Sequence, residues 1–308
     1  MSTSSHTTLF PGIRHTNTVT RRPLKKHTTT LELCVLGSGS GGNSTVVRSG
    51  DAVMLIDVGF GPVTIARRLA ASNTTLEHVR AILLTHLDQD HFRPAWIQTL
   101  ARWKIPLFLH RWQVPDLHRH DVSRHLENAG LIHIFDREPF EPLPKIHVEP
   151  VSLPHDRQGT SGFLVQSAAG RIGYATDLGH VPSRLLDCFS GVDLLAIESN
   201  YDPEMQRSSP RPTFVKRRIM GRLGHLSNAQ AFEAVRQITE RSPQGRPQHI
   251  VLLHRSQRCN EPRRVLSEFD QDPQISRRVT LTHQRRRSRW FKIRPLPPIR
   301  YYQLNWQF

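Results

Sequence analysis

The stretch that most constrains the fold is residues 85–91, which read Thr-His-Leu-Asp-Gln-Asp-His. Two imidazoles and two carboxylates fall within six residues, directly after the apolar β-like run at residues 81–84. Polar groups of this kind are costly to hold together on one turn unless a cation neutralises the carboxylates. We therefore expect a metal site at a strand-to-helix turn, with a helix following over residues 92–103.

Further apolar β-like runs precede and follow this turn, and the later ones alternate with helical stretches. We expect strands at residues 31–36, 43–48, 52–56, 81–84, 107–109, 146–153, 163–166, 171–176, 193–198 and 250–253, helices at 62–71, 92–103 and 230–239, and partial helix within 112–130. This order predicts an α/β fold in which two sheets pack together with helices outside. Periodicity alone also allows an ordinary three-layer α/β fold.

Residues 37–42 read Gly-Ser-Gly-Ser-Gly-Gly and match the spacing of a dinucleotide-binding fingerprint, with Asp57 twenty residues beyond Gly37. That motif requires a helix after its glycines. Residues 44–47 are Ser-Thr-Val-Val, which favours a strand. We therefore predict a hairpin here and no organic cofactor.

The net charge of +16 is concentrated at the two ends of the chain. Residues 1–30 contain five Lys/Arg and residues 277–308 contain nine, with no acid in either, so about +2 remains for residues 31–276. We predict a disordered basic leader over residues 1–30, one folded domain over residues 31–284, and a basic Pro/aromatic tail over residues 285–308. Residues 285–289 of that tail either attract a polyanion through phosphate contacts or are simply solvated.

The sequence contains no apolar run of the roughly 18–20 residues that span a bilayer, and the N-terminus lacks the apolar segment of a secretory signal. Its three cysteines include no CxxC pair and do not form a disulfide framework. We expect a cytoplasmic protein without a membrane partner.

Three further candidate ligands each come just after a β-like run. His155 follows residues 146–153, Asp177 follows residues 171–176, and His254 follows residues 250–253. Each alone is an ordinary residue, but strand ends at one edge of a sheet point into one crevice. Their shared placement therefore predicts that they converge on residues 85–91.

At this point the chain resembles the metallo-β-lactamase-fold hydrolases, whose hallmark T-H-x-H-x-D-H is similar to residues 85–91. Residues 36–44 and 55–59 look like the opening of that family. Residues 198–202 (Glu-Ser-Asn-Tyr-Asp) and 224–228 (Gly-His-Leu-Ser-Asn) resemble more narrowly the YycJ/WalJ-type subgroup, which is associated with exonuclease activity on DNA. The resemblance covers about residues 31–283. It implies a four-layer αββα sandwich of two mixed β-sheets with outer helices.

By position, the resemblance also implies two divalent metal ions, Zn or Mn, and a role for each matching residue. The first ion would take His86, Asp88 and His155, the second would take Asp90, His91 and His254, and Asp177 would bridge the two. Asp57 would orient ligands without binding metal. His225 resembles the histidine that contacts the scissile phosphate in ribonuclease J-type enzymes, so Asp90 and His225 are the candidate catalytic residues.

Asp88 departs from the family pattern, which has a histidine at this position. Either the substitution loses the first metal, or the carboxylate replaces the imidazole as a ligand. We favour the second interpretation because a carboxylate is a competent oxygen donor and the other ligands of that site are present. Harder oxygen ligation would favour manganese over strict zinc binding.

The ligand set predicts hydrolysis by a hydroxide formed from a metal-bound water, attacking phosphorus or a carbonyl carbon. Cations lie before His225 and after His254, which favours an anionic substrate. Those before it, the candidate contacts to a substrate phosphate, are Lys216, Arg217, Arg218 and Arg222; those after His254 are Arg255, Arg258, Arg263 and Arg264.

We therefore predict a phosphodiesterase, specifically an exonuclease, with nucleic acid as its partner and DNA favoured over RNA. One alternative is a small-molecule hydrolase acting on a lactone, a thioester or a cyclic phosphodiester, since the same metals would serve it. The other is a non-catalytic binding protein with a degenerate metal site.

Overall fold

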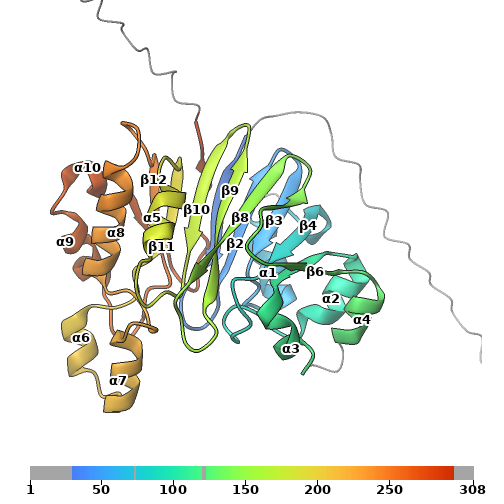
Figure 1. Cartoon of the computed structure of the whole chain (residues 1–308), viewed down its shortest axis with the longest axis horizontal. Coiled ribbons are helices and arrows are strands. Elements are labelled where there is room, and N and C mark those ends of the chain that lie inside the picture. The colour runs from blue at the N-terminus through green and yellow to red at the C-terminus, as the bar shows by residue number, and fades with distance from the viewer. Residues whose placement is uncertain (1–29, 73, 120–122, 295–308) are drawn as a thin grey trace, which may run out of the picture.

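The computed structural model describes residues 30–72, 74–119 and 123–294. The predicted leader, apart from Thr30, and residues 295–308 of the predicted tail lie outside the described residues. Two seven-stranded sheets pack face to face, and helices cover both outer faces (Figure 1). The predicted four-layer αββα sandwich is therefore confirmed, and the three-layer alternative is wrong.

Each sheet combines antiparallel and parallel pairs. The first sheet has the order β14-β1-β2-β3-β4-β5-β6. Its strands are β1 (Glu32–Gly37), β2 (Ser44–Ser49), β3 (Ala52–Ile56), β4 (Val79–Leu83), β5 (Leu107–His110), β6 (Ile132–Phe135) and β14 (Phe291–Lys292). The second has the order β13-β12-β11-β10-β9-β8-β7. Its strands are β7 (Phe140–Leu143), β8 (Ile146–Leu153), β9 (Thr160–Ser167), β10 (Gly170–Ala175), β11 (Leu194–Glu198), β12 (His249–Leu253) and β13 (Val279–Leu281).

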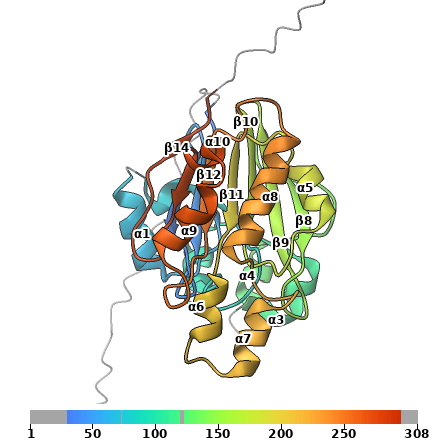
Figure 2. The same ribbon diagram turned by 90° about the vertical axis from the view of Figure 1, so that its left-hand side faces the viewer.

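The helices fall into three groups. Those on the first sheet are α1 (Pro62–Ala70), α2 (Trp96–Trp103), α3 (Val114–Leu117) and α4 (Arg124–Asn128), with the short 3₁₀ turns η1 (Leu76–His78) and η2 (Arg111–Gln113). Those on the second are α5 (Ser183–Phe189), α8 (Asn228–Glu240), α9 (Pro262–Phe269) and α10 (Pro273–Ser276). The pair α6 (Pro203–Ser208) and α7 (Thr213–Met220) extends from one end of the sandwich, the end where α3 lies (Figures 1 and 2).

Strand periodicity explains how one short strand serves two apolar layers. In β3, Met54 and Ile56 join the cluster between the two sheets, whereas Val53 and Leu55 join the cluster under the helices of the first sheet. Successive side chains of a strand point to opposite faces. Because both faces are covered, the strand reads as a continuous apolar run.

The hairpin predicted at the glycine-rich loop is confirmed, because β1 pairs antiparallel with β2; β9 likewise pairs antiparallel with β10. From β3 to β6, and from β10 to β13, neighbouring strands are parallel. Their carboxyl ends therefore meet at one edge of the sandwich. The predicted helix at 92–103 begins later, at Trp96, because residues 92–95 are still part of the connecting loop.

Part of the segment assigned to the basic tail is built into the first sheet. Phe291 and Lys292 pair antiparallel with β1, and the backbone N–H of Ser288 donates to the Val35 carbonyl at 2.8 Å. Phe291 is 1% exposed and joins the cluster between the sheets. The alternation of apolar Phe291 with polar Lys292 suits an edge strand, so residues beyond 284 help to close the sandwich.

We predict that Phe291→Ala lowers the free energy of unfolding by about 3 kcal/mol, because it leaves a cavity in the core between the sheets. Lys292→Ala, on the opposite face of the same strand, is the matched control and should change it by less than about 0.5 kcal/mol. Urea denaturation followed by circular dichroism measures both. Equal, small effects would show that β14 does not contribute to the core.

Candidate metal centre

The predicted site residues meet at the carboxyl ends of the strands. Residues 86–91 follow β4, and His155 follows β8 in the opposite sheet. Asp177 follows β10, and His254 comes directly after β12. The site therefore straddles both sheets, at the end of the sandwich that carries α6 and α7.

The potential ligand atoms form overlapping groups, each within 4.8 Å. One group contains His86, Asp88 and His155; another contains Asp90, His91 and His254; a third joins His86 and His91 to Asp177; and the last contains Asp177, Glu198, His225 and His254. The first two groups contain the same residues that the sequence assigned to the first and second ions. Asp177 belongs to a group on either side, as a bridging carboxylate would.

Three site residues have left-handed backbone conformations that are uncommon outside glycine. The φ angles of Asp57, Asp177 and His254 are 60°, 54° and 50°. Each residue comes just after a buried strand. Asp177 and His254 join the ligand groups, whereas Asp57 lies against His91. Strain of this kind costs on the order of 1 kcal/mol per residue and persists where surrounding structure enforces it.

Neighbouring oxygens hold one ring nitrogen of each histidine in the ligand groups. On the first side, His86 Nδ1 lies 3.0 Å from Thr85 Oγ1, and His155 Nδ1 lies 2.8 Å from the Gly224 carbonyl oxygen. These contacts leave Nε2 of both rings directed at the centre. Fixing one nitrogen in this way sets the tautomer and direction of a metal-binding imidazole.

Asp57 plays this role for His91. Its Oδ2 lies 2.8 Å from His91 Nδ1, while the Thr85 backbone N–H donates to its Oδ1 at 2.8 Å. His91 Nε2 then lies 3.0 Å from Asp177 Oδ2 and 3.6 Å from Asp90 Oδ2. Asp57 is fully buried and absent from the ligand groups, which matches the orienting role expected for it.

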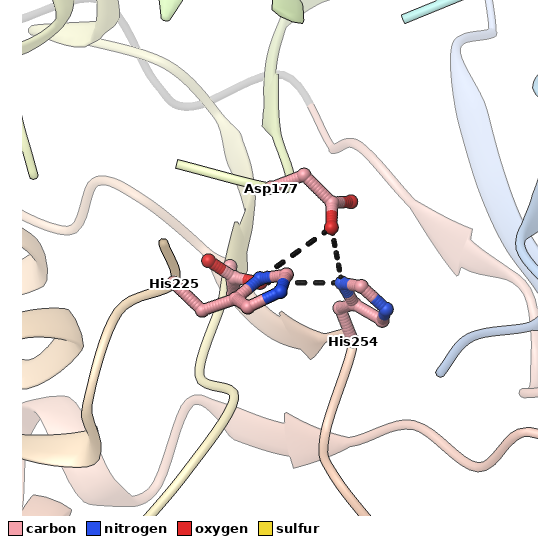
Figure 3. A group of neighbouring side chains, drawn as sticks. Asp177, His225 and His254 are labelled. Carbon is pink, nitrogen blue, oxygen red and sulfur yellow. Dashed lines mark hydrogen bonds and ion pairs between the residues drawn. The ribbon is translucent and has the colours of Figure 1, made fainter. Parts of the chain in front are cut away.

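Glu198 is a site residue whose role the sequence reasoning missed. It is fully buried, and its Oε1 lies 2.8 Å from His225 Nδ1 and 3.2 Å from His254 Nδ1. Asp177 Oδ1 also lies 2.7 Å from His254 Nδ1 and 3.5 Å from His225 Nδ1 (Figure 3). The sequence does contain a signal for Glu198, because a carboxylate stands at the end of the apolar strand β11. Asp57 stands at the end of β3 in the same way, and a supporting role was predicted for it.

The electrostatics of the centre favour a cation. Burial acts against charge on Asp177, but the adjacent His254 and His91 imidazoles hold its pKa well below its usual range. For Asp90, burial is likewise outweighed by His91 and His254, and the pKa falls to about 2. Burial also opposes charge on His91 and His254, yet the carboxylates around them raise the pKa of both rings well above the usual value. A divalent cation could replace those ring protons.

The residues present fit a metal pair. His254 Nε2 is buried and has no hydrogen-bond partner among the described residues. An unpaired buried nitrogen is costly, and it lies 3.4 Å from Asp90 Oδ2, where a shared ion would satisfy both atoms. Burial lowers the pKa of His86 well below its usual value, which keeps that imidazole neutral and able to bind metal. The clustered His and Asp side chains are thus consistent with a dinuclear metal site.

The Asp88 carboxylate lies near His86 and His155, the two histidines assigned to the first ion. Its Oδ2 lies 3.8 Å from His86 Nε2, and its side chain is 59% exposed. The carboxylate therefore sits at the mouth of the site and not in its floor. It also lines a hollow of about 560 Å³ beside the Gly-rich loop, together with Ser40, Asp90 and Arg93.

Two cavities open onto the centre. The smaller, about 280 Å³, is lined by Asp90, Asp177, His225 and His254 and also by Phe214 of α7. The larger is a groove of about 1130 Å³ that begins at His86, Asp88 and His155. Arginines from three parts of the chain line this groove: Arg119, Arg157, Arg217, Arg218 and Arg222.

The groove includes some predicted phosphate contacts and adds others. Arg217, Arg218 and Arg222 line it, but Lys216 faces a separate hollow, where its ammonium donates to the Arg207 carbonyl. Arg119 and Arg157 were missed because they are distant in sequence from His225. Arg157 lies two residues after the candidate ligand His155, so its position in the sequence was an available signal, whereas Arg119 joins the groove only through the fold.

The cations that follow His254 in the sequence do not line either cavity. Arg255 donates to the Asn260 carbonyl at 2.8 Å, and Arg264 pairs with Glu204 at 2.7 Å. Arg258 lines a small hollow beside Cys259. These cations after His254 therefore lie outside the two cavities at the metal centre.

The family model described as the Beta-lactamase superfamily domain matches residues 53–254. The chain therefore belongs to the metallo-β-lactamase superfamily, and its fold and His/Asp cluster are those of a metal-dependent hydrolase. The crystal structure of the metallo-β-lactamase fold protein YhfI from Bacillus subtilis superimposes with a TM-score of 0.62 at 14% identity, covering 85% of this chain and 99% of that one.

Two curated relatives are similar over most of the chain. The exodeoxyribonuclease WalJ of Streptococcus pneumoniae is 30% identical over 231 residues, which are 73% of this chain and 82% of that protein. The exodeoxyribonuclease YycJ of Bacillus anthracis is 27% identical over 230 residues, 73% of this chain and 83% of that protein. Among the described residues, no helix is long and apolar enough to cross a membrane.

We predict that Asp57→Asn lowers metal affinity about 10–100-fold, because it weakens the contact that orients His91. The measurement is metal content by mass spectrometry after dialysis against a graded metal buffer. Asp51→Asn, at an exposed turn between β2 and β3, is the control and should bind metal as the wild type does. Wild-type affinity in Asp57→Asn, with the fold intact, would contradict the orienting role.

Proposed function

We propose that this protein is a dinuclear-metal-dependent phosphodiesterase that acts on DNA as an exonuclease. The observation that carries the proposal is the arginine-lined groove that opens onto the metal centre. Similarity to two exodeoxyribonucleases over 73% of the chain supports DNA as the substrate class.

The groove supports an anionic, extended substrate. Arg218 pairs with Asp156, and Arg119 pairs with Asp116 at 3.0 Å. Arg157, Arg217 and Arg222 make no ion pair or side-chain hydrogen bond within the described residues. Unpaired guanidinium groups in one groove are suited to successive phosphates, since each can bind two phosphate oxygens.

In this proposal His86, Asp88 and His155 would hold the first ion, Asp90, His91 and His254 would hold the second, and Asp177 would be shared between them. When bound, the two ions would activate a water and stabilise charge on the phosphate oxygens. Three carboxylates among the ligands would favour manganese over strict zinc binding.

The chain itself supplies a donor for the reacting phosphate. Glu198 engages Nδ1 of His225, so Nε2 is the nitrogen left to face the smaller cavity. His225 is one-fifth exposed, whereas the carboxylates behind it are buried. From this position it can donate a hydrogen bond to a phosphate oxygen or a proton to the leaving oxygen.

We predict that Asp90→Asn abolishes hydrolysis of end-labelled duplex DNA in the presence of Mn²⁺. His225→Ala should lower turnover about 100-fold or more while leaving metal content unchanged, because His225 lies outside the two ligand sets assigned to the ions and acts in this proposal as a donor. His125→Ala, an exposed histidine on α4, is the control. A protein that cleaves a lactone panel independently of His225, and leaves DNA and RNA intact, would overturn the proposal.

The groove arginines should account for the salt dependence of DNA binding. We predict that Arg157→Ala and Arg222→Ala each weaken binding to all sequences and reduce the slope of log affinity against log salt by about 1. Arg184→Ala is the control and should leave the slope unchanged. Arg184 is on α5, where its guanidinium pairs with Glu149 of β8. Unchanged slopes in both groove variants would place the DNA elsewhere.

A second group of cations extends this proposal toward the Gly-rich loop. The pKa of His283 is lowered by burial and by Arg286, Arg255 and Arg285 around it. Gln284, next in the chain, accepts from the Gly41 backbone N–H at 3.0 Å, which places this group beside the hollow at Asp88 and Asp90. The predicted binding of a polyanion by residues 285–289 is best tested with the double variant Arg285→Ala and Arg286→Ala. Deletion of residues 285–308 would also remove β14.

A further inference from the structure

Phe214 is an exposed aromatic ring at the edge of the metal centre. Its side chain is 74% exposed, and it lines the same cavity as Asp90, Asp177 and His254. Within the described residues, no aromatic ring and no cation contacts the Phe214 ring. The helix that carries it, α7, contains no buried residue. A large apolar ring in water is unfavourable, so this placement suits a ring that a ligand covers.

The other walls of the cavity restrict what could cover the ring. The cavity is about 280 Å³, near the lower end of the roughly 300–1,000 Å³ of small-molecule pockets. It has room for one flat group and not for a stack of bases. Arg218 lines both this cavity and the arginine groove, so a chain of phosphates in the groove would bring a single base to Phe214.

We propose that Phe214 stacks on the base of the terminal nucleotide whose phosphate lies at the metal centre. The proposal rests on the nuclease function above and adds a requirement: the end nucleotide must be unpaired when it is cleaved, so the last pair of a duplex must open first. A base that remains in a pair would keep its partner strand against the cavity mouth. Stacking on an aromatic side chain accepts any base, because every base offers a π-face.

The test compares cleavage of a DNA end that carries a base with cleavage of one that lacks it. Full-length protein with Mn²⁺ is incubated with DNA whose unpaired end nucleotide is either thymidine or an abasic tetrahydrofuran analogue, and cleavage of the first bond is followed under single-turnover conditions. We expect the wild type to cleave the thymidine end about tenfold faster or more. Phe214→Ala should cleave both ends at the slower, abasic rate, and Phe214→Tyr should restore the difference.

Val63→Ala, which alters another highly exposed apolar residue, is the matched control and should behave as the wild type. Equal slowing of both ends by Phe214→Ala, or no slowing of either, would overturn the stacking role while the nuclease function stands. Wild-type protein that cleaves neither substrate, despite bound metal, would instead overturn the nuclease function.

Discussion

The structure depends on burying three carboxylates at one end of a β-sandwich. Asp57, Asp177 and Glu198 are each 2% exposed or less, and buried charges of one sign are costly unless they are paired. The imidazoles of His91, His225 and His254 lie against them and compensate the charge. The same carboxylate–imidazole contacts fix the orientation of each ring. The interactions that stabilise the buried carboxylates therefore also direct the remaining ring nitrogens toward one centre.

Two sheets are needed to build this centre because neither contains a complete ligand set. The first sheet supplies residues 86–91 after β4, and the second supplies His155, Asp177 and His254 after β8, β10 and β12. The apolar cluster between the sheets holds the two halves in register. The cavities differ in character as well, since the larger is lined by arginines and the smaller has Phe214 in its wall.

Much of the fold and the ligand set could be predicted from the sequence, because buried strands read as apolar runs and the ligands come directly after them. Short or irregular elements could not. The edge strands β6 and β14 expose polar residues such as His133 and Lys292, and α7 has no buried face to give a helical period. Glu198 was seen as part of a motif but not as the partner of His225, because that contact joins residues 27 positions apart. Arg119 reaches the groove only through tertiary structure.

The central claim is that a loop carrying Asp88 in place of a histidine still holds two ions bridged by Asp177. The most direct measurement is titration of metal-free protein with Mn²⁺, followed by electron paramagnetic resonance. Two ions that share one carboxylate, about 3.5–4 Å apart, should bind as two equivalents per chain and give an exchange-coupled spectrum. A single equivalent with the six-line spectrum of an isolated ion would contradict the account.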